Sequence, residues 1–86
     1  MKTVFVIGSN SFSGSDFIDL LLGTNRYNVV GVSRSPEKKE LFLPYKKRLD
    51  SSNFEFHQID LNHDMLKLFS LLVDRKPAYV VNFAAQ

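Results

Sequence analysis

The sequence contains no cysteine, which excludes a disulfide framework and any zinc site built on cysteine. It also lacks an apolar run of membrane-spanning length, and the short apolar run near its N-terminus is too brief for a signal peptide. Its 86 residues suffice for at most one small domain, and 44% of them are apolar, enough for a globular core. We therefore expect one cytoplasmic domain, residues 1–86, with no membrane partner.

Metal-binding and nucleic-acid motifs are missing as well. His57 and His63 lie six positions apart, unlike the i, i+4 pair of a helical zinc motif, so we expect no metal site. The net charge is only +2, but six of the eleven basic residues fall in one segment: Arg34, Lys38, Lys39, Lys46, Lys47 and Arg48. Such a run is typical of a solvated surface, and a site for anionic phosphates is the more specific interpretation. Nucleic acid is the weakest interpretation, because no recognition motif accompanies the charge, and we expect no such partner.

Four segments are predicted to be strands because they are short, apolar and rich in β-branched or aromatic residues. They cover residues 4–7, 28–33, 54–61 and 78–85, and the last is apolar enough to be buried on both faces. Helical patterns separate these segments, so the chain alternates strand and helix. This alternation predicts an α/β fold with parallel strands joined by right-handed crossovers.

Two segments carry the apolar periodicity of a helix. Residues 12–22 form the first, with a stop at residues 23–25 that begins with Gly23. The second has an apolar stripe of Met65, Leu68, Phe69 and Leu72, cap candidates at residues 62–64, and an end at Pro77. A brief helix is also expected after Ser35, where Pro36 suits a first helical position and Pro44 interrupts it. The aromatic side chains of Phe54, Phe56 and Phe69 are expected in the core.

The turn between the first strand and the first helix contains Gly8 and Gly14. A glycine at a strand end can adopt conformations closed to other residues, and the helix that follows offers unpaired N–H groups and a positive dipole end to an anion. The polar residues of the turn, Ser9, Asn10, Ser11 and Ser13, can cap the helix or donate to phosphate oxygens. An ordinary serine-capped turn explains these residues equally well, because a glycine pair by itself is a weak signal.

The end of the second strand carries Ser33, Arg34 and Ser35. In dinucleotide-binding folds this position meets the adenosine ribose, where an acid suits a free 2′-hydroxyl and an arginine suits a 2′-phosphate. The tip has no acid, and a guanidinium can grip a phosphate through two parallel hydrogen bonds. A plain surface arginine is the alternative interpretation. If a dinucleotide binds here, we expect NADP rather than NAD.

Together these residues resemble the start of the extended short-chain dehydrogenase/reductase family, the nucleotide-sugar epimerases and dehydratases. Gly8 and Gly14 match the outer positions of the family's G-x-x-G-x-x-G motif, Ser11 replaces its middle glycine, and Phe12 matches its aromatic position. Residues 60–61, Asp-Leu, resemble the family's Asp-hydrophobic pair, and residues 82–85, Asn-Phe-Ala-Ala, resemble its fourth strand end. With Gln86 and the arginine at the second strand end, the chain is most similar to GDP-mannose 4,6-dehydratase-like members.

The resemblance implies the N-terminal half of a Rossmann doubly wound parallel sheet, with strand order 3-2-1-4 and an NAD(P) cofactor. It assigns the pyrophosphate to residues 8–14, the adenosine ribose to the tip around Arg34, and the adenine to residues 60–61. The small residues after the fourth strand would let the backbone approach the inner ribose. The implied cofactor residues are Gly8, Asn10, Ser11, Phe12, Ser13, Gly14, Ser33, Arg34, Ser35, Asp60, Leu61, Phe83, Ala84 and Ala85.

The activity implied by the resemblance is that of a nucleotide-sugar 4,6-dehydratase, which oxidises the hexose at C4, eliminates water across C5 and C6, and returns the hydride. The family's catalytic Ser/Thr, Tyr and Lys lie beyond the fourth strand, and Tyr27, Tyr45 and Tyr79 lack the lysine of a helical Tyr-x-x-x-Lys motif. The chain is therefore expected to be a fragment without catalytic residues or turnover of its own. The longer protein would act on a nucleotide sugar as a homo-oligomer. The alternatives are a 4-epimerase or reductase of the same family and a non-catalytic dinucleotide-sensing module.

Overall fold

A computed structural model describes residues 1–35 and 53–84 of the chain. Four strands form one parallel sheet: β1 (Lys2–Ile7), β2 (Tyr27–Ser33), β3 (Phe54–Gln58) and β4 (Tyr79–Asn82). Their order is β3-β2-β1-β4, which confirms the predicted fold class and strand order. The brief helix expected after Ser35 and the last predicted residue of the fourth strand, Ala85, lie outside the described residues.

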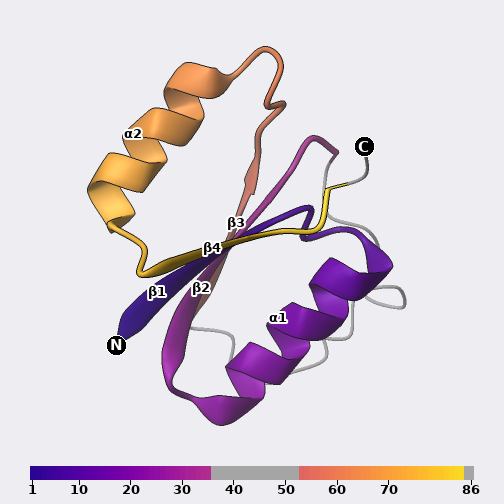
Figure 1. The fold of residues 1–86 in the computed structure, drawn as a ribbon, viewed down its shortest axis with the longest axis vertical. Coiled ribbons are helices and arrows are strands. Elements are labelled where there is room, and N and C mark those ends of the chain that lie inside the picture. The colour runs from indigo at the N-terminus through magenta and orange to yellow at the C-terminus, as the bar shows by residue number, and fades with distance from the viewer. Residues whose placement is uncertain (36–52, 85–86) are drawn as a thin grey trace.

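Two helices, α1 (Phe12–Thr24) and α2 (Met65–Arg75), cover opposite faces of the sheet (Figure 1). Each face has its own core, because successive side chains of a strand point to opposite sides. Val4 and Val6 of β1 pack with Ile18 of α1, whereas Phe5 packs with Leu68 of α2. Phe5 and Val6 are fully buried, and burial of such a side chain contributes about 1.5–3 kcal/mol. The cores on both faces therefore hold β1 in place.

The end of α1 differs from the prediction. The helix continues through Gly23 to Thr24, and Asn25 takes the left-handed conformation, with φ 55°, that ends it. The Asn25 N–H donates to the Leu22 carbonyl oxygen at 3.3 Å and closes the last turn. Asparagine tolerates this conformation, so it serves here as the cap that the sequence pattern assigned to glycine.

The buried face of α2 is also shifted from the predicted stripe. Leu68 and Leu71 are buried against the sheet, whereas Met65 and Phe69 are 42% and 55% exposed. The prediction of Phe69 as a core residue is therefore wrong. Apolar residues occur all around this helix, with Leu66 also exposed, so the pattern alone does not select the side that packs. The other two aromatic residues expected in the core, on β3, are partly buried.

The two outer strands are shorter than predicted. β3 ends at Gln58, and Ile59 follows it as a buried residue outside the strand. Within the described residues β4 pairs with β1 alone, and Tyr79 and Val80 are each 52% exposed. The described part of the fourth strand is therefore not buried on both faces, because β4 is an edge strand there.

Candidate functional site

The turn after β1, residues 8–11, requires a glycine at its first position. Gly8 has φ +83°, and a Cβ there would lie 2.6 Å from the backbone nitrogen of Ala84 and 2.7 Å from the carbonyl carbon of Phe83. The Gly8 N–H donates to the Val32 carbonyl oxygen at 2.7 Å, so the turn also joins β2. A side chain at Gly8 would force the turn away from the chain that follows β4.

The N-terminus of α1 packs on the same turn. A Cβ on Gly14 would lie 2.3 Å from the Gly8 carbonyl oxygen and 2.8 Å from Ser11 Oγ. Ser11 is the N-cap, because its hydroxyl accepts from the Gly14 N–H at 2.9 Å. Its φ of −70° needs no glycine, so a serine at the middle position of the motif fits the turn and caps the helix.

The neighbouring residues of the turn have different surroundings. Ser9 is fully buried, and a Cβ on Gly31 of β2 would lie 2.9 Å from Ser9 Cβ. Gly31 thus makes room for the turn, a role that was not predicted although a glycine inside a strand signals a close backbone approach. Ser13 is exposed in the first turn of α1, and Phe12 is 83% exposed.

The tip of β2, residues 33–35, is held from two sides. Asn10, which is 5% exposed, donates from Nδ2 to the carbonyl oxygen and to Oγ of Ser35, both at 3.0 Å. From the end of β3, Gln58 donates from Nε2 to the Arg34 carbonyl oxygen at 3.2 Å. The hydroxyl oxygens of Ser33 and Ser35 lie 3.5 Å apart. These bonds fix the backbone from which the exposed Arg34 side chain extends.

Asp60 follows β3 and organises the turn into α2. Its Oδ1 accepts from the Asn62 N–H at 2.9 Å, and its Oδ2 lies 2.9 Å from His63 Nδ1. The hydrogen bond with His63, followed by that from Asn62, lowers the pKa of Asp60, and the same contact raises the pKa of His63. Asp64, one of the cap candidates, accepts from the Asp60 N–H at 3.0 Å and makes no side-chain cap bond to α2. Asp60 therefore caps the turn between β3 and α2.

The turn after β1, the tip of β2 and the end of β3 enclose a cleft of about 500 Å³. Of the predicted cofactor residues, the cleft is lined by Gly8, Asn10, Ser11, Ser33, Arg34, Ser35, Asp60, Leu61 and Ala84. Ile7, Val32, Ile59 and Asn62 complete the lining and were not predicted. These four residues could have been predicted from their place at or just after the carboxyl ends of strands, because ligands of open α/β sheets bind there.

The remaining predicted residues do not line the cleft. Phe12 and Ser13 are exposed on α1, and Gly14 is buried against the turn. The Phe83 ring packs against Phe17 of α1, with 5.5 Å between ring centroids, so its side chain contributes to the core. Ala85 lies outside the described residues.

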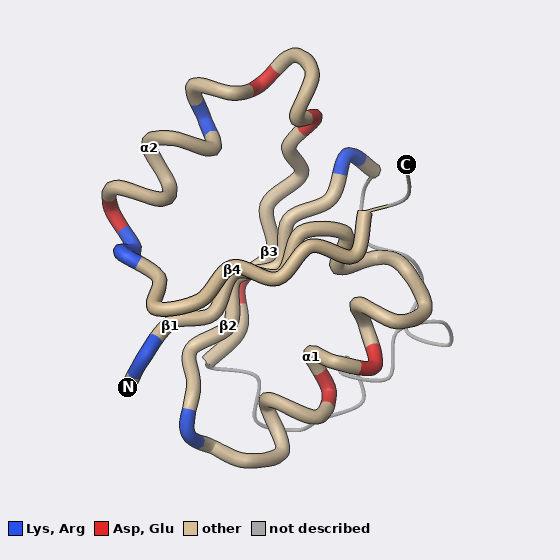
Figure 2. The backbone as a smooth tube through the Cα atoms, viewed as in Figure 1, with Lys and Arg blue, Asp and Glu red and all other residues tan. Residues whose placement is uncertain are grey.

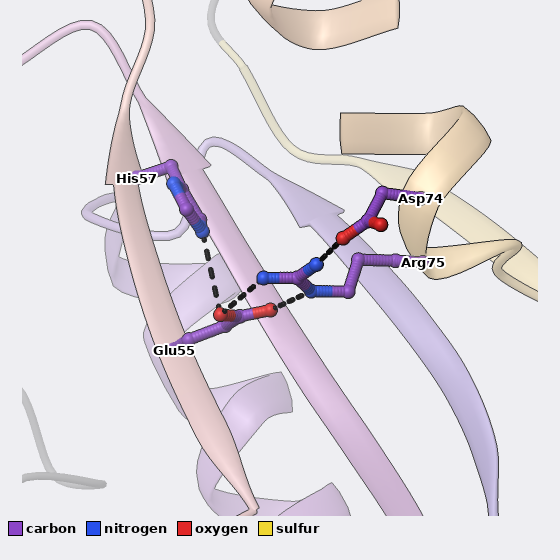
Figure 3. Close-up of polar contacts among 4 residues, drawn as sticks. All are labelled: Glu55, His57, Asp74 and Arg75. Atoms are coloured by element: carbon purple, nitrogen blue, oxygen red, sulfur yellow. Dashed lines mark hydrogen bonds and ion pairs between the residues drawn. The ribbon is translucent and has the colours of Figure 1, made fainter. Parts of the chain in front are cut away.

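An ion-pair cluster ties the C-terminal end of α2 to β3 (Figure 3). Arg75 donates from Nε and Nη2 to the two carboxylate oxygens of Glu55, at 2.5 and 3.1 Å, and it also pairs with Asp74. His57 Nε2 lies 3.5 Å from Glu55 Oε2. The hydrogen bond from Arg75 lowers the pKa of Glu55. The cluster lies beside a groove of about 650 Å³ between β3 and α2. None of the predicted cofactor residues lines this groove.

Metal sites and membrane-spanning helices are absent from the described residues. Residues 1–35 and 53–84 contain no cluster of three or more His, Cys, Asp or Glu side chains that could hold a metal ion. No helix in the same part of the chain is long and apolar enough to cross a membrane. Figure 2 shows the basic residues of the described backbone spread over several elements, and of the basic segment only Arg34 is described.

The chemistry of the cleft fits a dinucleotide. At one end Gly8 has no side chain, so its backbone lines the cleft. The N-terminus of α1 lies beside this end, and a helix N-terminus favours an anion. Ile7, Val32 and Ile59 supply apolar walls. At the other end Ser33, Arg34 and Ser35 line the cleft at the tip of β2. An anion-favouring end, apolar walls and a polar, positively charged end are the kinds of surface that phosphates, a flat base and a ribose require.

Comparisons with known proteins agree with the fold. A family profile described as NAD dependent epimerase/dehydratase family matches residues 4–86. A comparison with curated protein sequences found no match. Among solved structures, the chain is similar to dTDP-glucose 4,6-dehydratase from Bacillus anthracis in complex with NAD, with a TM-score of 0.81 and 23% identity over 100% of this chain and 27% of that chain.

Two further solved structures are similar. WbmH from Bordetella bronchiseptica in complex with NAD+ has a TM-score of 0.77 and 29% identity, over 100% of this chain and 26% of that chain. UDP-glucuronic acid 4-epimerase from Bacillus cereus in complex with NAD has a TM-score of 0.67 and 30% identity, over 96% of this chain and 26% of that chain. The chain thus spans about a quarter of the length of these proteins. The profile match covers nearly all of the sequence, and the chain belongs to the NAD dependent epimerase/dehydratase family.

Proposed function

We propose that the chain forms the dinucleotide-binding part of a nucleotide-sugar 4,6-dehydratase. The main support is the cleft of about 500 Å³, where the turn after β1, the tip of β2 and the end of β3 face one another. Gly8 and Ser11 would hold the pyrophosphate, Arg34 the adenosine ribose and Asp60 the adenine, and Ala84 would lie beside the inner ribose. The bound cofactor would supply the reversible hydride transfer of the reaction. The described residues bind and orient that cofactor.

We further propose NADP as the cofactor. Arg34 extends from a tip that hydrogen bonds hold on both sides, and its charge contributes to the lowered pKa of Asp60 after the larger effects of His63 and Asn62. Arg34 and Asp60 both line the cleft. A charge-assisted contact with a 2′-phosphate is worth about 1–3 kcal/mol, so NADP should bind roughly ten- to a hundredfold more tightly than NAD. The similar solved structures named above hold NAD, so this preference would distinguish the protein from them.

Calorimetric titration of the protein at its natural length with NADP and NAD tests the cofactor assignment. Arg34→Ala should weaken NADP binding about tenfold or more and leave NAD binding nearly unchanged. Arg26→Ala is the matched control, because Arg26 is an exposed arginine before the other end of β2, and it should change neither affinity. If the wild type binds both cofactors equally, or if Arg34→Ala keeps their ratio, the assignment of Arg34 is wrong.

The dehydratase assignment is tested by the mass of the product. With dTDP-glucose or GDP-mannose and the cofactor, a 4,6-dehydratase yields a 4-keto-6-deoxy sugar nucleotide that is lighter than its substrate by one water. A 4-epimerase yields an isomer of unchanged mass, so mass spectrometry after chromatography separates the two. Cofactor binding without turnover of any nucleotide sugar would instead favour a dinucleotide-sensing module. The proposal also includes a homo-oligomer in the cytoplasm, for which light scattering and fractionation are the measurements.

A further inference from the structure

Asn10 connects the two parts of the cleft that a dinucleotide would occupy at once. It belongs to the turn after β1, and its amide nitrogen donates to two acceptors of Ser35 at the tip of β2, each at 3.0 Å. The two residues are 25 positions apart in the sequence. Asn10 is only 5% exposed, so its amide nitrogen is shielded from water, whereas Ser35 is exposed. The turn and the tip are therefore linked by one buried side chain.

Among the described residues, the side-chain bond from Gln58 to the tip is weaker than the bonds from Asn10. Gln58 donates to the Arg34 carbonyl oxygen at 3.2 Å from an exposed side chain. An exposed amide can exchange such a partner for water at little loss. The side chain of Ser33 makes a hydroxyl contact of 3.5 Å with Ser35, and the carbonyl oxygen of Ser33 accepts from the Ile59 N–H at 2.8 Å. Among the contacts of residues 1–35 and 53–84, the bonds from Asn10 are thus the main side-chain connection to the backbone on the far side of Arg34.

We infer that Asn10 is a positioning residue, through which the phosphate turn sets the place of Arg34 and thereby the discrimination between a 2′-phosphate and a 2′-hydroxyl. This assignment rests on the function proposed above. Asn10 acts through Ser35, because its two bonds from Nδ2 are made there. The pyrophosphate is common to both cofactors, so a change at the turn alone would weaken NADP and NAD equally. Only a change at the tip alters the ratio of the two affinities.

The experiment is a calorimetric titration of wild type and Asn10→Ala, at natural length, with NADP and with NAD. Loss of the buried amide should lower the ratio of NADP to NAD affinity about threefold to tenfold. Asn28→Ala removes an amide near the opposite end of β2 and should leave the ratio unchanged. In an Arg34→Ala background, Asn10→Ala should change the ratio no further, because no guanidinium is then left to position.

Equal weakening of both cofactors by Asn10→Ala would overturn the inference, and so would a ratio that still falls in the absence of Arg34. If the wild type binds neither cofactor, both the inference and the proposed function are wrong. Asn10→Ser keeps a small polar group in the buried site, but its hydroxyl can donate to only one acceptor. It should show the same direction of change if Asn10→Ala does not fold. Loss of the folded state in both variants would make Asn10 a residue required for folding, and would also overturn the inference.

Discussion

Alanine at Gly14 should affect stability in the opposite direction from alanine at Gly23, although both glycines lie in α1. At an exposed helical position, the change from glycine to alanine stabilises a protein by about 1 kcal/mol, largely because the unfolded chain loses conformational freedom. Gly23 is exposed near the end of the helix, so alanine there should approach this gain. At Gly14 the same methyl group would meet neighbouring backbone.

The magnitude at Gly14 follows from the contacts around it. A Cβ there would lie 2.3 Å from the Gly8 carbonyl oxygen and 2.8 Å from Ser11 Oγ. To restore an ordinary contact, the start of α1 and the turn must move apart by about 1 Å. Overpacking of this kind costs about 1–3 kcal/mol, and the movement also disturbs the N-cap bond between Gly14 and Ser11, worth about 1 kcal/mol. After the gain in helix propensity is subtracted, we expect a net loss of about 1–3 kcal/mol.

Circular dichroism during thermal unfolding, on wild type, Gly14→Ala and Gly23→Ala at natural length, measures the difference. The unfolding midpoint should fall in Gly14→Ala and stay equal or rise in Gly23→Ala. Dinucleotide affinity should fall only in Gly14→Ala, because only there does the turn after β1 move. Stabilisation by both substitutions would refute the reasoning, since the added methyl group would then fit against Gly8 without displacement.

Three further predictions concern the ion pairs and the isolated chain. Arg75→Ala should lower the free energy of unfolding by no more than about 1 kcal/mol compared with Lys67→Ala, because the Arg75 and Glu55 side chains are 35% and 38% exposed and solvent screens the pair. Arg75 lowers the pKa of Glu55 from its usual 4.5, so the stabilisation by this ion pair is complete above about pH 4.5 and is lost as the pH falls through the pKa of Glu55 in the folded state. The free energies of unfolding of Arg75→Ala and Lys67→Ala, measured by denaturant titration, should therefore converge in acid. Asp60→Asn should lower the pKa of His63 toward 6.5 in an NMR titration, and an unchanged pKa would mean that the contact is not formed in solution. In the wild type, the contact between His63 and Asp60 favours folding below pH 6.5, and this stabilisation is lost as the pH rises through the raised pKa of His63. The 86 residues alone should show no turnover of nucleotide sugars with either cofactor, and product on a chromatogram or a change at the absorbance of the reduced cofactor would contradict this.

Local patterns in the sequence were sufficient to predict the sheet and the position of the cleft. Short apolar segments that alternate with amphipathic ones indicate parallel strands, and parallel strands bring their carboxyl ends to one edge of the sheet. Gly8, Arg34 and Asp60 each follow one of three such strands, so their meeting at one cleft follows from chain order. Single residues within elements were less predictable. A glycine was expected to end α1, but Asn25 does so, because either residue can adopt the left-handed conformation.

The sequence by itself determined which segments pair and at which edge a ligand can bind, but only the tertiary structure decided which residues touch there. Asn10 was predicted to cap a helix or bind phosphate, yet its amide reaches Ser35, 25 positions away. Gly31 makes room for Ser9, and α2 turns Phe69 toward solvent. The reason is the range of the forces involved. Periodicity and glycine preferences act within a few residues, whereas these contacts depend on the register of β1 against β2 and on how each helix packs over the whole core.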